Sequence, residues 1–173
     1  DETVERAGLS LGGLVMPGSA SWKTMAREAA VSIAWALALA AVIFVPFYFG
    51  WRFVWRPTRA FDYHPTVRAF AEDASSQLAV IALPEEAFFR GYLQSKLDQA
   101  FPKKVRIFRA EVGISIAVTS MLFALGHVAT IRAPVRLAVF FPSLVFGWLR
   151  ARTGGVGASI VFHALCNLFS EAL

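Results

Sequence analysis

Long apolar segments separated by short basic ones dominate the chain. Five of them are interpreted as membrane-spanning helices, and they cover residues 29–51, 76–97, 110–129, 134–149 and 156–173. A helix needs about 20 mostly apolar residues to cross a bilayer, and runs of this length are too long for strands. No stretch alternates apolar and polar residues at period two over a strand length. The pattern therefore predicts an all-α, polytopic transmembrane helical bundle with about five spans.

The segment before the first span is of a different kind. Residues 1–21 are rich in glycine and mixed in polarity, so residues 1–28 are interpreted as an amino-terminal arm or interfacial segment. Residues 29–173 then form one transmembrane domain, because no second domain fits beside five spans in 173 residues. The chain begins at Asp1 without a methionine, so it is interpreted as a processed or trimmed piece that can lack flanking helices, and five spans is a minimum.

Composition supports a multi-pass integral membrane protein. Hydrophobic residues make up 57% of the chain and charged residues only 17%, unlike a typical soluble domain. The formal charge is +5, but the basic residues flank the apolar segments, as in loops that lie on anionic lipid. The lipid bilayer is therefore an expected partner, and nucleic acid is not. The single cysteine allows no intrachain disulfide.

The charged residues of segment 76–97 indicate chemistry. Charged groups at bilayer depth are costly and usually face a protein interior. Residues four apart share a helix face, so Glu86 can pair with Arg90, and this pair is interpreted as a buried structural ion pair. Glu85 is five residues from Arg90 and remains unpaired in its own helix. Its face is otherwise apolar, which would desolvate the carboxylate as a general base working near neutral pH requires.

Two interpretations of Glu85 remain open from this segment alone. Glu85 can be a general base, or it can cap a helix that starts at Pro84, since proline favours the first helical position and acids favour the first turn. His127 and His163 lie inside the third and fifth segments. One intramembrane histidine is more often a satisfied core residue. Two of them together with an unpaired glutamate favour a functional site.

His163 and Asn167 are four residues apart and project from one helix face. An imidazole and a carboxamide side by side can hold a developing oxyanion. If the spans alternate in direction, Glu85, His127 and this pair all lie toward the same membrane face. No cofactor is predicted, but a divalent metal held by Glu85, His127 and His163 remains an alternative, although no His-Glu-x-x-His spacing occurs.

Three motifs in these segments resemble those of the CAAX-protease and bacteriocin-processing family, which includes the eukaryotic Ras-converting endopeptidase. Glu-Glu-x-x-x-Arg, Phe-x-x-x-His and His-x-x-x-Asn are matched by Glu85, Glu86 and Arg90, by Phe123 and His127, and by His163 and Asn167. Each motif alone is weak, but three in order on separate segments are specific. The resemblance covers about residues 76–168, the motif core of the predicted protease domain, and implies a CAAX-protease-like fold.

The resemblance also implies an intramembrane endopeptidase of the glutamic type, which cleaves near the carboxy terminus of a membrane-anchored or lipidated protein. Glu85 would activate a water together with His127. His163 and Asn167 would stabilise the tetrahedral oxyanion. The residues that support the site would be Glu86, Arg90 and Phe123. Pro84, directly before the paired glutamates, departs from the family's pattern and leaves the local helix geometry open.

The distribution of basic residues favours a cytoplasmic amino terminus, which would place the site toward the outer face of the membrane. That orientation suits a sorting protease of the bacterial inner membrane that trims carboxy-terminal anchors, of the kind called myxosortases. Two other functions remain open. One is a non-catalytic relative that acts as a membrane binding or immunity protein, and the other is a proton-coupled transporter. The short chain and the lack of internal repeats argue against the transporter.

Overall fold

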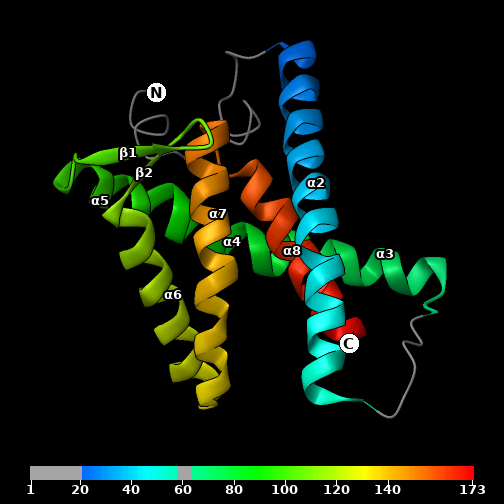
Figure 1. Ribbon diagram of the computed structural model, residues 1–173. Coiled ribbons are helices and arrows are strands. Elements are labelled where there is room, and N and C mark those ends of the chain that lie inside the picture. The colour runs from blue at the N-terminus through cyan, green and yellow to red at the C-terminus, as the bar shows by residue number, and fades with distance from the viewer. Residues whose placement is uncertain (1–20, 58–63) are drawn as a thin grey trace.

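The computed structural model describes residues 21–57 and 64–173 and consists mainly of helices (Figure 1). Its elements in chain order are α2 (Trp22–Trp55), α3 (Val67–Ser76), η1 (Gln77–Ala82), α4 (Leu83–Glu86), η2 (Ala87–Leu93), α5 (Gln94–Ala100), β1 (Lys104–Ile107), β2 (Ala110–Gly113), α6 (Ile114–Ile131), η3 (Pro134–Val139), α7 (Phe140–Thr153) and α8 (Gly157–Ala172). The all-α class predicted from the sequence is confirmed. One small hairpin, formed by β1 and β2, was not predicted.

The helix α2 is 34 residues long. The hydroxyl of Ser21 accepts a hydrogen bond from the backbone N–H of Thr24 at 3.2 Å and so caps its first turn. Ala36 is its one buried residue, so most of its apolar surface faces outward, as expected for a helix surrounded by lipid. Residues 22–28, predicted to belong to the arm, form the first turns of α2. The rest of the predicted arm, 1–20, lies outside the described residues.

A continuous helical run from Val67 to Ala100 carries the paired glutamates. Its segments η1 and η2 are π-helical and lie on either side of α4, which contains Pro84. Proline lacks the N–H for the helical hydrogen bond, and its ring crowds the preceding turn, so wider turns nearby let the helix continue. Because the chain is helical from Val67 onward, the alternative in which Glu85 caps a helix starting at Pro84 is wrong.

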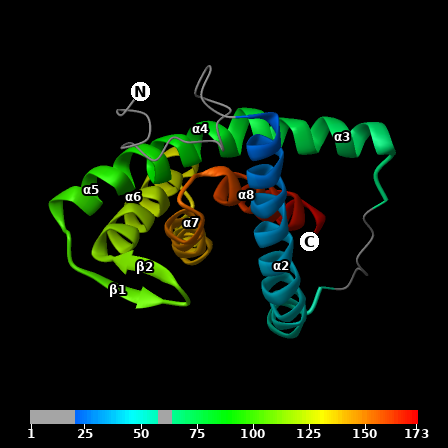
Figure 2. The ribbon, with the colours of Figure 1, turned by 90° about the horizontal axis from the view of Figure 1, so that it is seen from above.

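In the described part of the chain, three helices are long and apolar enough to cross a membrane: α2, α6, and the segment Pro134–Thr153 that η3 and α7 form. They correspond to the first, third and fourth predicted spans. The second predicted span lies in the glutamate-bearing run, which crosses α2 and α7 instead of running beside them (Figures 1 and 2). Its many polar residues make it the least apolar of the five segments.

The fifth predicted span forms α8, whose 16 residues are fewer than the roughly 20 that cross a bilayer. Residues 21–57 and 64–173 therefore contain three candidate spans, by length and composition, instead of the predicted five. The helix α8 packs against both α2 and α7, and also contacts the glutamate-bearing run. A core cluster joins α2, α6, α7 and α8. It consists of Ala36, Phe123, Phe146, Leu149, Ala158 and Phe162.

Candidate active site

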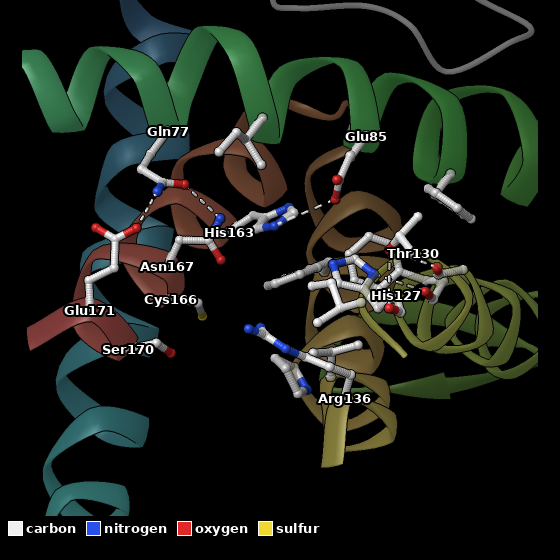
Figure 3. Close-up of a pocket in the computed structure, with 18 residues that line it drawn as sticks. Gln77, Glu85, His127, Thr130, Arg136, His163, Cys166, Asn167, Ser170 and Glu171 are labelled. Atoms are coloured by element: carbon white, nitrogen blue, oxygen red, sulfur yellow. Dashed lines mark hydrogen bonds and ion pairs between the residues drawn. The ribbon is translucent and has the colours of Figure 1, made fainter. Parts of the chain in front are cut away.

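A cavity of about 680 Å³ is lined by the glutamate-bearing run together with α6, η3, α7 and α8 (Figure 3). Glu85, His127, His163 and Asn167, the four residues predicted to be catalytic, all line it. They come from three helices that are far apart in the sequence. This arrangement agrees with the expectation that the four side chains lie toward the same membrane face. Aromatic side chains, among them Phe123, form part of the remaining wall.

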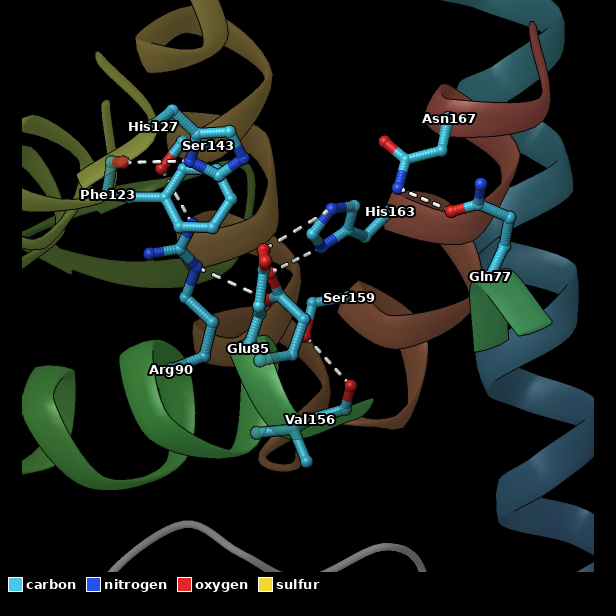
Figure 4. Close-up of polar contacts among 11 residues, drawn as sticks. Gln77, Glu85, Arg90, Phe123, His127, Ser143, Val156, Ser159, His163 and Asn167 are labelled. Carbon is cyan, nitrogen blue, oxygen red and sulfur yellow. Dashed lines mark hydrogen bonds and ion pairs between the residues drawn. The ribbon is translucent and has the colours of Figure 1, made fainter. Parts of the chain in front are cut away.

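His163 contacts both glutamates, and Figure 4 shows its ring facing Glu85. Its Nδ1 is 3.0 Å from Oε1 of Glu86, and its Nε2 is 3.8 Å from Oε2 of Glu85. Since an ionised carboxylate only accepts hydrogen bonds, the Nδ1–H of His163 donates to Glu86. The imidazole also stacks on Phe146, with ring centroids 4.8 Å apart. These contacts fix the ring so that Nε2 faces Glu85.

Glu86 and Arg90 form the buried ion pair that their spacing predicts. Nε of Arg90 is 3.3 Å from Oε2 of Glu86, and both side chains are 0% exposed. Nη2 of Arg90 donates to Oγ of Ser143 at 2.6 Å, which ties the pair to α7. The guanidinium also lies 5.1 Å from the ring centroid of Phe123, a cation–π distance. A buried charge is stable only when it is paired in this way.

Glu85 has different surroundings from its neighbour. Its side chain is 33% exposed and reaches the cavity, whereas Glu86 is fully buried. As expected, Glu85 has no partner in its own helix, and within the described residues its Oε2 makes no hydrogen bond. That Oε2 is a buried atom that faces Nε2 of His163, so the exposed part of the carboxylate is what can accept a proton from water in the cavity.

His127 contributes a second basic nitrogen to the cavity wall. Its Nδ1 is 3.0 Å from the backbone carbonyl oxygen of Phe123. Because a carbonyl oxygen only accepts, Nδ1 carries the proton, and in the neutral ring Nε2 keeps a free lone pair. Among the described residues, no hydrogen bond joins His127 to Glu85. The structure therefore places both groups on one cavity without direct contact (Figure 3).

Asn167 belongs to a hydrogen-bonded chain that sequence reasoning missed. Its Nδ2 donates to Oε1 of Gln77 at 2.8 Å, and Nε2 of Gln77 donates to Oε1 of Glu171 at 2.6 Å. Gln77 and Glu171 also line the cavity. A signal for both was present in the spacing, because Gln77 lies two turns before Glu85 and Glu171 lies one turn after Asn167.

Arg136, on η3, is a second group that the sequence analysis did not identify. It lines the cavity opposite the glutamate-bearing run (Figure 3). Within the described residues its guanidinium forms no ion pair with a carboxylate. A cation that faces a cavity without a partner is available to an anionic group of a ligand.

Glu85, His127 and His163 are also the residues that the metal alternative requires as ligands. In the parts of the chain that the structure describes, no three histidine, cysteine or acidic side chains converge to hold an ion. Glu85 and His163 approach each other, but Nδ1 of His163 is engaged by Glu86 and His127 lies apart from both. A protein zinc site requires three or four ligands around one point. In this structure Glu85, His127 and His163 do not surround one point in that way.

A family model described as type II CAAX prenyl endopeptidase Rce1-like matches residues 74–169, more than half of the chain. The chain belongs to this family. The Rce1-like match begins near the end of α3, extends into α8 and includes all three motifs. The resemblance stated from those motifs is therefore confirmed, and the chain is a membrane protease of the CAAX type at family level. No curated protein and no solved structure matches it.

Proposed function

We propose that this Rce1-like chain hydrolyses a peptide bond near the carboxy terminus of a membrane-anchored or lipidated protein, by a glutamic-type mechanism. The observation that carries the proposal is that Glu85, His127, His163 and Asn167 line one cavity. A base, a second proton acceptor and hydrogen-bond donors are the groups that amide hydrolysis needs around one carbonyl. The bacterial inner membrane is the proposed location, and a myxosortase-type activity is the proposed subtype.

In the proposed reaction, Glu85 and Nε2 of His127 hold a water between them. Glu85 accepts a proton as the water oxygen attacks the scissile carbonyl, because its partly exposed carboxylate lines the cavity. A C–O bond forms while the carbonyl π bond becomes an oxyanion. The proton held by Glu85 then passes to the leaving amine when the C–N bond breaks.

His163 and Asn167 would stabilise the oxyanion. One N–H of the Asn167 amide donates to Gln77, and the second remains for a ligand. Nδ1–H of His163 is engaged by Glu86, so Nε2 can donate only when both ring nitrogens carry protons. The proposed role of His163 therefore requires the imidazolium form during the reaction.

The test uses purified protein and a panel of membrane-anchored peptides with varied carboxy termini. The wild type is expected to cleave with or without a strong chelator, and Glu85→Gln to lose about 10²–10⁴-fold in rate. Glu111→Gln, at an exposed glutamate of β2, is the matched control. Normal cleavage by Glu85→Gln would refute the proposal, and chelator sensitivity would restore the metal alternative.

Absence of cleavage would favour one of the two other functions. If Glu85→Gln and His127→Ala then lower the melting temperature in detergent, the polar cluster serves packing, as in a non-catalytic relative. Proton flux into proteoliposomes across a pH gradient would instead support the transporter.

A further inference from the structure

The turn of the β1–β2 hairpin has an unusual sequence for its backbone. Its two central residues, Phe108 and Arg109, have φ values of 48° and 65°. These positive values at both central positions are those of a type I′ turn, which is normally made by Asn-Gly because larger side chains are strained there. Phe108 is 85% exposed, so its packing inside the protein does not compensate for the strain. Strain that the fold does not require indicates a function.

The strand that leads to this turn is amphipathic. Lys104 and Arg106 alternate with Val105 and Ile107, so basic and apolar side chains point to opposite faces, and all four are exposed. Lys104 pairs with Asp98 at 3.3 Å.

Basic groups without an acidic partner remain along the hairpin, from its open end to its tip. Within the described residues, no ion pair engages Lys103, Arg106 or Arg109, although Glu111 is the register partner of Arg106. The hairpin thus presents an exposed aromatic ring at its tip, next to Arg109, and further free cations along β1 and at its open end. That combination is complementary to a surface in which an anionic outer layer covers an apolar interior.

The position of the hairpin identifies that surface. Gly113 ends β2, and the next residue, Ile114, begins α6, one of the candidate spans. The hairpin therefore lies where the chain enters the bilayer. Nε1–H of Trp148, in the last part of α7, donates to the backbone oxygen of Ile107 at 3.1 Å and holds the hairpin at this end of the bundle (Figures 1 and 2).

We propose that the hairpin of residues 104–113 binds anionic phospholipids of the bilayer. Phe108 inserts among the headgroups, and Lys103, Arg106 and Arg109 bind their phosphates. The strained turn is then explained, because Asn-Gly would relax the backbone but remove both the ring and a cation from the tip. This inference concerns a surface outside the catalytic cavity and does not depend on the proposed peptidase activity.

The test measures how close anionic lipid lies to the hairpin. Val105→Cys, in a Cys166→Ala background, carries a fluorophore, and the full chain is placed in phosphatidylcholine nanodiscs. An equal fraction of brominated phosphatidylglycerol or brominated phosphatidylcholine is then added as quencher. Stronger quenching by the glycerol lipid is expected. The labelled protein is compared with three versions of it that carry a further change: F108N/R109G, R106Q, and R132Q at the other end of α6 as the control.

Loss of the tip should strongly reduce the preference for phosphatidylglycerol while the melting temperature stays the same or rises, since Asn-Gly relaxes the turn. R106Q should reduce the preference roughly fivefold, and R132Q should leave it unchanged. Equal quenching by the two lipids in the unaltered hairpin overturns the proposal, as does full preference in F108N/R109G. If that variant fails to fold, R106Q decides, and an unchanged preference there overturns the proposal.

Discussion

Glu86 and His163 are joined by a 3.0 Å hydrogen bond between side chains that are 77 positions apart in the sequence. The same carboxylate forms the ion pair with Arg90. One buried group on α4 therefore balances a guanidinium and orients an imidazole that belongs to α8. The support of the site and the position of a proposed catalytic ring depend on a single side chain.

Glu86→Gln is expected to destabilise the protein strongly. A neutral glutamine leaves the charge of Arg90 buried and unbalanced, which costs about 3–5 kcal/mol in comparable cases. Denaturation in detergent measures the loss. The double variant Glu86→Leu with Arg90→Met removes both charges and should regain most of the stability without regaining cleavage. Equal stability of Glu86→Gln and wild type would show that the charge of Arg90 does not need Glu86 to balance it.

Gln77 is expected to be a positioning residue for Asn167. Gln77→Leu removes the acceptor of the Asn167 amide and should lower kcat by up to about 10²-fold with little change in KM. The pair Gln77→Glu with Glu171→Gln exchanges the two groups and keeps both hydrogen bonds possible. Activity should return in that double variant. If Gln77→Leu cleaves at the normal rate, the orientation of Asn167 does not depend on this contact.

Arg136 is expected to contribute to substrate specificity. A guanidinium without an acidic partner, on the wall of the cavity, can bind the free carboxylate of a peptide's carboxy terminus. Peptides with an amidated carboxy terminus should therefore be cleaved roughly 10- to 100-fold less efficiently, because they lose one hydrogen bond to a charged group. Arg136→Gln should abolish that difference, and Arg136→Lys should retain part of it. Equal cleavage of acid and amide by the wild type would contradict this role.

Gly147 is expected to be required for the packing of α7 against α6. A Cβ at this position would lie 2.6 Å from Cγ2 of Ile116 and 3.2 Å from Oε1 of Gln94. Gly147→Ala should therefore cost about 1–3 kcal/mol, measured by thermal denaturation in detergent. Ile116→Ala in the same chain should relieve part of the loss. Gly126→Ala is the control, because a Cβ there meets nothing within 4 Å.

Local spacing predicted those parts of the site that one helix determines. Glu86 and Arg90 had to share a face because they are four residues apart, and their ion pair is present. The motifs also identified four residues that line one cavity. The contact between His163 and Glu86 was not predictable in this way, because it depends on how α8 packs against the glutamate-bearing run. Spacing within a helix says nothing about the packing between helices.

Two elements of the fold departed from their sequence signals for physical reasons. The run 67–100 is long enough to span a membrane, but it crosses α2 and α7 instead of running beside them (Figures 1 and 2). Pro84 and its π-helical neighbours are accommodated within this helical run. The β1–β2 hairpin lacks the Asn-Gly signal by which such turns are recognised, because Phe108 and Arg109 occupy the turn instead. In the hairpin, the residues that mislead a propensity argument are those that carry a proposed function.

The distance in sequence between Glu86 and His163 also has a consequence for the order of synthesis. Ribosomes add about 5–20 residues per second, so roughly 4–15 s separate the appearance of the two side chains. During that interval Glu86 already has Arg90, four residues further on, as a partner that is made almost at the same moment. The nascent helix can thus hold its charges as a pair before α8 exists. An unfinished chain lacks half of the proposed catalytic groups, and proteolysis can begin only after the helix that carries them has been made.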